Sequence, residues 1–228
     1  VTYNNIAAKE MVDELCVTIC NAEGEAVSNV KTDSIRGYVM RSIDKSNLKT
    51  KTMMVDMLNY GAAAQEYFDY NTEDLANNQL TEIHKGYATG EVEYENKSDK
   101  GTNYWGSRLL LESNIKLQIA FKNVDTTMTA KITFTDHYGK AKTAEAPVEL
   151  QGNAYMVTID ELVIADGRQL VKVEVYDGNN VVAEVSDSIE SFVARDTSGN
   201  KLFPMLMRFS DSAYAYFHTN EKGATTEE

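Results

Sequence analysis

The sequence contains most of one unit twice, and this repetition limits the possible folds more than any other feature. Three pairs of segments align at nearly constant offsets: 33–41 with 187–195, 1–19 with 157–175, and 60–68 with 209–217. Residues 1–68 therefore match 157–217, whereas nothing ahead of residue 1 matches 105–156. Repeats of this size usually stack and present a surface, and they rarely build a single catalytic cleft.

Composition indicates an ordinary globular protein with an acidic surface. The chain has 228 residues, of which 43% are hydrophobic and 25% charged, enough for one large domain or two small ones. Its net charge of −13 argues against nucleic acid or an anionic membrane as a partner, because both would repel it. Since no apolar run approaches the ~20 residues of a membrane span, we expect no membrane insertion. A chain that starts inside a repeat is expected to be part of a larger protein.

The second copy reads as a series of short strands followed by helices. Alternation of apolar and polar residues predicts strands at 114–121, 129–135, 143–150, 154–159, 170–176 and 181–185. Turn residues separate these strands, a pattern typical of an antiparallel β-sandwich-like body.

Two helices are predicted in each copy. The first begins after Asp33 or Asp187, which we place at the N-cap. The second covers 48–68 or 202–217, where apolar residues recur at helical spacing. The fold class we expect is α+β: an antiparallel β-sandwich-like body with helical hairpins, built from an internal duplication whose first copy is truncated.

Four regions follow from this pattern. They are the first copy at 1–80 (a strand near Val1, a β-hairpin and a helical pair), a linker at 81–106, the second copy at 107–220 (a β-sandwich plus a helical pair), and a disordered tail at 221–228. Because the first copy has too few strands to close a sheet, we expect it to pack on the second copy or to pair with another chain.

Catalytic, phosphate-binding and metal-binding signatures are missing from the sequence. The histidines His84, His137 and His218 are scattered and are expected to face solvent. Cys16 and Cys20 lie about 13 Å apart along a predicted strand, too far for a disulfide, and we interpret them as packing residues.

The acidic segment 69–74 resembles a calcium loop but lacks the glycine and glutamate of an EF-hand, so a cap on a short helix at 73–76 explains it better. The chain has enough carboxylates for a glycoside-hydrolysing pair, but most acidic residues lie where local structure accounts for them. We therefore expect no enzyme activity, no cofactor and no metal.

Aromatic side chains are the best candidates for ligand contact. The chain has thirteen tyrosines against seven phenylalanines, a balance that favours contact surfaces. Tyr94, Tyr104 and Trp105 lie in a glycine-containing stretch and could stack on a sugar ring or anchor a protein partner. Trp105 could instead fill the sandwich core where its first strand begins.

Several segments resemble a repeated module of large secreted, wall-attached proteins of gut Firmicutes. They are 57–68 (MLNYGAAAQEYF), 6–11, 165–170 and 210–216, and the resemblance covers nearly the whole chain. It implies an extracellular location, attached to the cell surface as part of a larger protein. Most such modules have no assigned activity; some proteins of this kind bind immunoglobulin variable regions as B-cell superantigens, and others lie beside carbohydrate-active modules.

The expected function is therefore that of a non-catalytic, adhesive binding module of a bacterial surface protein, with host immunoglobulin as the first candidate ligand. One alternative is a carbohydrate-binding module that uses Trp105, Tyr104 and Tyr94. The other is a structural spacer that projects further domains from the cell wall.

Overall fold

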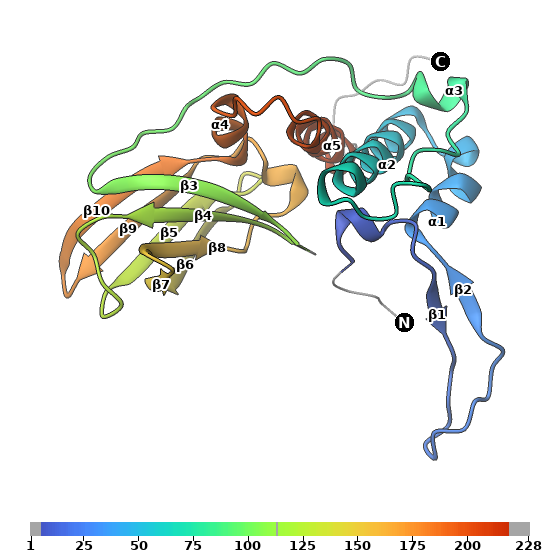
Figure 1. The fold of residues 1–228 in the computed structure, drawn as a ribbon, viewed down its shortest axis with the longest axis horizontal. Helices are drawn as coiled ribbons and strands as arrows, with labels where there is room; N and C mark the ends of the chain where they lie inside the picture. The colour runs from blue at the N-terminus through green and yellow to red at the C-terminus, as the bar shows by residue number, and fades with distance from the viewer. Residues whose placement is uncertain (1–5, 113, 219–228) are drawn as a thin grey trace.

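The computed structural model describes residues 6–112 and 114–218, and in these ranges the chain is a mixed α+β protein with antiparallel sheets (Figure 1). The helices are η1 (Ala8–Glu10), α1 (Ile35–Ser42), η2 (Ile43–Lys45), α2 (Leu48–Phe68), α3 (Glu82–Lys85), η3 (Ile164–Asp166), α4 (Ile189–Ala194) and α5 (Leu202–Phe217). The strands are β1 (Leu15–Val17), β2 (Lys31–Asp33), β3 (Tyr104–Leu111), β4 (Ile115–Phe121), β5 (Thr129–Thr135), β6 (Ala141–Pro147), β7 (Glu149–Gln151), β8 (Ala154–Ile159), β9 (Val171–Asp177) and β10 (Asn180–Asp187). None of the described helices is long and apolar enough to cross a membrane.

Two four-stranded sheets contain most of the strands, in the orders β3-β4-β8-β7 and β10-β9-β5-β6. Alternate residues of each strand point inward, such as Leu117 and Ile119 on β4 and Ile132 on β5, and all three are buried. This apolar cluster continues into the helices, where Leu58 and Leu206 belong to it. The sheets and helices therefore share one core.

Most predicted strands and helices are found where the pattern placed them. The segments 129–135 and 154–159 are β5 and β8, and 48–68 and 202–217 are α2 and α5. The strand predicted at 143–150 is divided at Val148 into β6 and β7, which belong to different sheets. The region 81–106 is only partly a linker, because it contains α3 and the beginning of β3.

Both predicted N-caps are one residue too early. The caps are Ser34 and Ser188, whose hydroxyls each accept a hydrogen bond from the backbone N–H three residues later, at 2.9 Å. Asp33 and Asp187 instead end strands β2 and β10, and each forms an ion pair eight residues on, with Arg41 and Arg195 respectively. Serine satisfies the first free N–H groups of a helix as well as aspartate does, so the residue type alone does not separate the two positions.

The predicted short helix at 73–76 is wrong. Gln65 of α2 is fully buried, and its Nε2 donates to the carbonyl oxygens of Asn71 (3.2 Å) and Asp74 (3.1 Å). Its Oε1 accepts from the N–H of Ala76 at 2.7 Å. One glutamine side chain therefore fixes this segment as a turn. The predicted strand near Val1 and the predicted tail at 221–228 lie outside the described residues.

Aligned residues at the bases of the two hairpins pair in the same way. In hairpin β1–β2, Leu15 pairs with Asp33, and in hairpin β9–β10, Val171 pairs with Asp187, so the two registers agree. Between the two halves, the ring of Tyr60 on α2 stacks on that of Phe209 on α5, with centroids 6.0 Å apart. The helices of the first half therefore pack against those of the second, as expected.

The hairpins differ in their surroundings. Strand β9 lies between β10 and β5, whereas β1 has β2 as its only neighbour among the described strands. In Figure 1 hairpin β1–β2 extends away from the helices and from both large sheets. This hairpin therefore pairs with no described strand of the second half, and the alternative expectation, pairing with another chain, stays a prediction.

A long segment, residues 86–103, connects the two halves, and we call it the strap. It crosses α5 and α4 on its way from α3 to β3 (Figure 1). Its Thr89 donates from the N–H and the hydroxyl to the buried carboxylate of Asp56, at 3.0 and 2.5 Å. Further along, Asp99 pairs with Ser186 on the outer edge of β10. The strap thereby covers the edge that hairpin β9–β10 would otherwise expose.

Candidate functional site

The three predicted site residues are not brought together. Trp105 lies at a bulge of β3, is 51% exposed and lines a shallow hollow. Tyr104 packs against the core, and its hydroxyl lies 3.2 Å from that of Ser107. Tyr94, in the strap, also packs against the core, where burial raises its pKa. The interpretation of Trp105 as a core residue is wrong, because the bulge places its side chain in solvent.

The solvent side of sheet β3-β4-β8-β7, which we call the outer face, carries a row of polar residues beside Trp105. Leu117 and Ile119 of β4 point into the core, so Gln118 between them points outward. In the sheet register, Arg108 of β3 lies opposite Gln118, and Gln118 lies opposite Thr158 of β8. Three neighbouring strands thus place planar or hydroxylated side chains in line.

Hydrogen bonds hold these side chains in fixed orientations. Arg108 donates from Nε to Gln118 Oε1 and from Nη2 to Gln151 Oε1, both at 2.7 Å. Gln118 Nε2 donates to Thr158 Oγ1 at 2.8 Å, and Gln151 Nε2 donates to Glu149 Oε2 at 3.1 Å. Gln118 is only 2% exposed although it points away from the core. The network is therefore preorganised, which lowers the entropy cost of binding a ligand.

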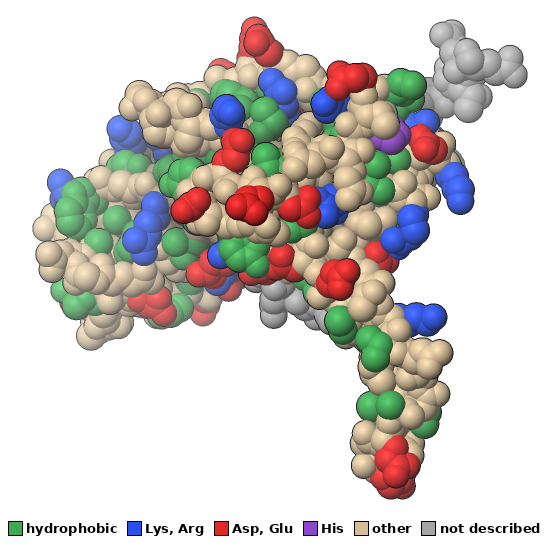
Figure 2. All heavy atoms as spheres, turned by 45° about the vertical axis from the view of Figure 1, so that its right-hand side comes forward, with side chains coloured by type: hydrophobic (Ala, Val, Ile, Leu, Met, Phe, Trp, Pro, Cys, Tyr) green, Lys and Arg blue, Asp and Glu red, His purple; other side chains and the backbone are tan. Residues whose placement is uncertain are grey.

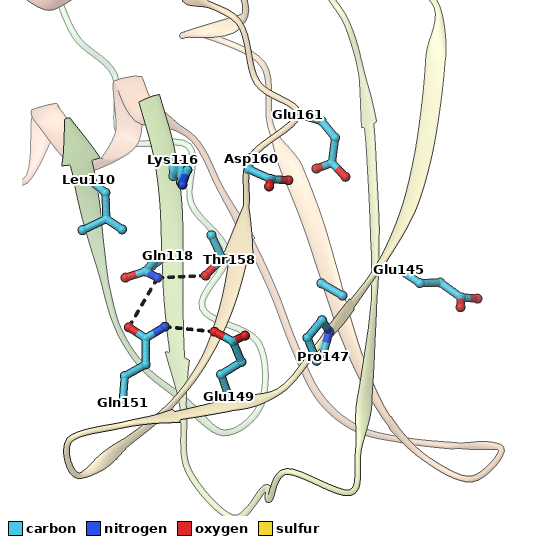
Figure 3. A pocket seen from close by; sticks show the side chains of 11 residues that line it. Leu110, Lys116, Gln118, Glu145, Pro147, Glu149, Gln151, Thr158, Asp160 and Glu161 are labelled. Atoms are coloured by element: carbon cyan, nitrogen blue, oxygen red, sulfur yellow. Dashed lines mark hydrogen bonds between the residues drawn. The ribbon is translucent and has the colours of Figure 1, made fainter. Parts of the chain in front are cut away.

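Two hollows flank this network. The first, of about 230 Å³, is lined by Trp105, Gly106, Ser107, Arg108, Ala120, Ala154 and Met156. Most of the residues that line it have small side chains, and Trp105 is the largest of them. The second, of about 410 Å³, is lined by Leu110, Lys116, Gln118, Glu145, Ala146, Pro147, Glu149, Gln151, Thr158, Asp160 and Glu161 (Figure 3). An elongated ligand could contact both hollows along the outer face.

Charge on the outer face is mainly negative. The second hollow has the carboxylates Glu145, Glu149, Asp160 and Glu161 in its lining, against a single lysine, Lys116. Lys116 is itself paired with Glu112 at 3.3 Å. An anionic ligand would be repelled there, whereas a neutral ligand rich in hydroxyl groups would find both donors and acceptors.

A second group of exposed aromatic side chains lies at the end of α5. This aromatic patch consists of Tyr138, Tyr214, Tyr216 and Phe217, which are between 38% and 61% exposed. The ring centroids of Tyr138 and Phe217 are 6.4 Å apart. The ring centroid of His137 lies 4.1 Å from that of Tyr138 and 5.5 Å from that of Phe217. Sequence reasoning missed this patch because Tyr138 lies far from the α5 residues along the chain.

Two of the three histidines do not match their prediction. His84 on α3 is buried, with its Nε2 3.0 Å from the carboxylate of Asp44. His137 is largely buried as well, with its Nδ1 2.8 Å from the carboxylate of Asp166. These histidines are positioned by contacts across the fold, 40 and 29 residues apart in sequence, which a local pattern does not contain.

The cysteines are also not packing residues, since Cys16 and Cys20 are both exposed, and no disulfide joins them. Across residues 6–112 and 114–218, no group of three or more His, Cys, Asp or Glu side chains could hold a metal ion.

The sequence contains one usable signal for the outer face. Gln118 and Arg108 occupy outward positions of strands whose inward positions are largely apolar, so alternation predicts that both side chains point away from the core. What alternation lacks is the register that joins Arg108 to Gln151, which are 43 residues apart. Family models, curated proteins and solved structures were compared with this chain, and none of them matches it.

Proposed function

We propose that this chain is a non-catalytic binding module of a bacterial surface protein and that it binds a neutral carbohydrate on the outer face. The observation that carries this proposal is the half-exposed indole of Trp105 next to the hydrogen-bonded row of Arg108, Gln118 and Thr158. A sugar ring has an apolar face and a rim of hydroxyls, and this surface offers a partner for each. Trp105 would stack on the ring, and Arg108 and Thr158, held in place by the buried Gln118, would bind the hydroxyls.

A glycan array followed by calorimetry tests this proposal. Trp105→Ala should weaken binding at least about tenfold while leaving Tm nearly unchanged, since the indole is half in solvent. Gly106→Val should block the first hollow without disturbing the fold, because a Cβ at Gly106 meets no atom within 4 Å. Tyr138→Ala, in the aromatic patch and outside the lining of both hollows, is the matched control and should bind normally. A chain that binds no glycan, or that binds equally well without Trp105, would refute the proposal.

Host immunoglobulin is the second candidate ligand, and the aromatic patch favours it. Tyrosine and phenylalanine side chains are enriched in protein–protein interfaces relative to the rest of the surface. Tyr138 and Phe217 would be the central contacts, within an interface of ~1,600 Å² of total buried surface. Binding to antibody variable regions would make the module superantigen-like, in agreement with the resemblance to secreted surface proteins.

Biolayer interferometry against polyclonal immunoglobulin, its Fab and its Fc tests this second candidate. Saturable binding to a subset of Fab that Tyr138→Ala weakens and Trp105→Ala leaves intact would support it. Absence of Fab binding at tens of micromolar would refute it. A chain that binds neither glycan nor antibody would leave the spacer function.

We also infer that the two large sheets form a β-sandwich-like body and that the chain is an internal duplication whose first copy lacks this body. Equal hairpin registers, equal serine caps and equal ion pairs at aligned positions support the duplication. In addition, the N–H of Arg36 donates to the carbonyl oxygen of Met11, and that of the aligned Glu190 donates to Gly167, at 2.9 and 2.8 Å.

A reciprocal pair of residues gives further support. In the first half, a Cβ on Gly61 would lie 2.7 Å from the sulfur of Met11. Met11 aligns with Gly167, and Gly61 aligns with Ser210. In the second half the glycine therefore stands at the position of the methionine, and Gly167 faces Ser210. Each half therefore places one glycine at the same close approach, on opposite sides of it. A duplicated unit that diverged under a constant backbone spacing would have this property.

A further inference from the structure

The open edge of hairpin β1–β2 carries an apolar stripe. Leu15, Val17 and Ile19 align with Val171, Val173 and Val175, and these three valines are fully buried in the second half. In the first half, Leu15 and Val17 are only half-buried and Ile19 is 56% exposed. Figure 2 shows the hairpin as a projecting arm with apolar side chains on its surface. β1 thus has the alternating apolar residues of a central strand, although it lies at the edge of its sheet.

The second half identifies what covers this edge. Strand β5 pairs there antiparallel with β9, placing Phe134 opposite Val171, Ile132 opposite Val173 and Ala130 opposite Val175. Resting on the duplication proposed above, we propose that β1 is a docking edge for a β5-type strand from a second β-sandwich body, supplied by another unit of the same repeat. That strand would place Phe, Ile and Ala opposite Leu15, Val17 and Ile19.

Backbone directions agree with strand addition on this side. The carbonyl oxygen of Ile19 accepts from the N–H of Val27 at 2.8 Å, so the backbone of Ile19 faces the β2 side. Because these directions alternate along a strand, the N–H of Thr18 faces the open side. Thr18 aligns with Glu174 of β9, which lies opposite Lys131 of β5.

The contact is confined to β1. Asn29, just ahead of β2, and Lys31, in β2, stand where β10 has the buried Ala183 and Val185. The incoming strand would therefore add to the edge of β1, and the β2 side would form the outer edge of the completed sheet.

An ion pair of the first half is also more exposed to solvent than the aligned ion pair of the second half. Asp187 and Arg195 are 0% and 21% exposed, and Arg195 donates to Ser98 of the strap at 2.8 Å. The aligned Asp33 and Arg41 are 47% and 60% exposed. Among the described residues, no strap crosses this ion pair. The first half is thus uncovered where both the body and the strap of a preceding unit would lie.

The test is a chain in which residues 102–156 are repeated directly ahead of Val1, compared with the unmodified chain by hydrogen exchange and mass spectrometry. This junction preserves the repeat, because Val1 aligns with Val157. Amides of 15–19 should exchange at least about 100-fold more slowly in the extended chain, and those of the added β5 segment should be protected too. Thr18→Pro in the extended chain should remove both effects and leave the original β5 protected.

Three results would overturn the inference. The first is an unchanged exchange rate of the amides of 15–19 in the extended chain. It would show that the added body does not pair with β1, whether or not that body is itself protected from exchange. Another is protection of 15–19 in the unmodified chain that grows with its concentration, which would make a second copy of the chain the occupant. The third is protection of 15–19 by added Fab, which would assign the edge to an antibody. Carbohydrate binding through Trp105 does not involve Thr18. The glycan measurement can therefore fail while the exchange measurement succeeds, and the reverse, so the two proposals are tested independently.

Discussion

The close approach between η3 and α5 gives the most direct test of the packing that the two halves share. Gly167 has ordinary backbone angles, with φ at −55°, so alanine is allowed there by its backbone. A Cβ on Gly167 would nevertheless lie 3.1 Å from the Cβ of Ser210, and the Ser210 hydroxyl would be closer still. Ser210 is buried and has little room to move. Gly167→Ala should therefore destabilise the protein.

The expected loss can be estimated from general values. Overpacking by one methyl group costs about 1–3 kcal/mol, and stiffening of the unfolded chain by Gly→Ala offsets about 0.4–1 kcal/mol of it. A net loss of about 1–2 kcal/mol corresponds to a Tm lower by about 2–8 °C for a chain of this length. Thermal unfolding followed by circular dichroism resolves such a change, and urea unfolding checks that the m-value is constant.

The second substitution makes the test specific. Ser210→Gly alone should cost about 0.5 kcal/mol of helix propensity, because it places glycine within α5. In the double variant the glycine moves to the other partner, as in the Met11–Gly61 pair of the first half. We therefore expect the double variant to be more stable than Gly167→Ala. If the two losses simply add, Gly167 is not required by this close approach, and the argument from the reciprocal pair fails.

Three further predictions concern charge and exposure. Arg195→Ala should destabilise by about 3–5 kcal/mol because it leaves the buried carboxylate of Asp187 without its cation, whereas Arg41→Ala, at the aligned exposed pair, should leave Tm nearly unchanged. Burial raises the pKa of Asp56, so the folded state binds the proton of this carboxyl more tightly than the unfolded state does. The stability that this group contributes is therefore lost as the pH rises from the pKa of the unfolded state to that of the folded state. Asp56→Asn should remove that part of the pH dependence while its amide still binds Thr89, as unfolding curves between about pH 3 and 7 would measure. Trp105→Ala should change the free energy of unfolding by less than about 1 kcal/mol, which urea unfolding checks.

Each of these three predictions would be contradicted by a specific result. Equal losses for Arg195→Ala and Arg41→Ala would mean that the strap does not isolate the first of these ion pairs from solvent. A pH profile of Asp56→Asn that parallels the unmodified chain would mean that Asp56 titrates alike in the folded and unfolded states. A loss of several kcal/mol for Trp105→Ala would return the indole to the core and remove the basis of the carbohydrate proposal.

Local pattern was sufficient where the determining interactions are local. Helix α2 was predicted with its observed ends because apolar residues recur every three to four positions from Leu48 to Phe68. β5 and β8 were predicted equally well, because alternation and flanking turn residues define a half-buried strand. The N-caps were misplaced by one residue, since Asp33 and Ser34 are both good caps and only the end of β2 decides between them.

The sequence by itself thus determined the ends of the long helices and most of the strands, because periodicity and turn chemistry act over a few residues. Only the tertiary structure decided that Trp105 is exposed, that His84 and His137 are buried, and that Arg108 meets Gln118 and Gln151. It also decided that one hairpin lies within a sheet while its counterpart stands open. These properties depend on strand register and on contacts between residues tens of positions apart, and no local pattern encodes which distant strand becomes a neighbour.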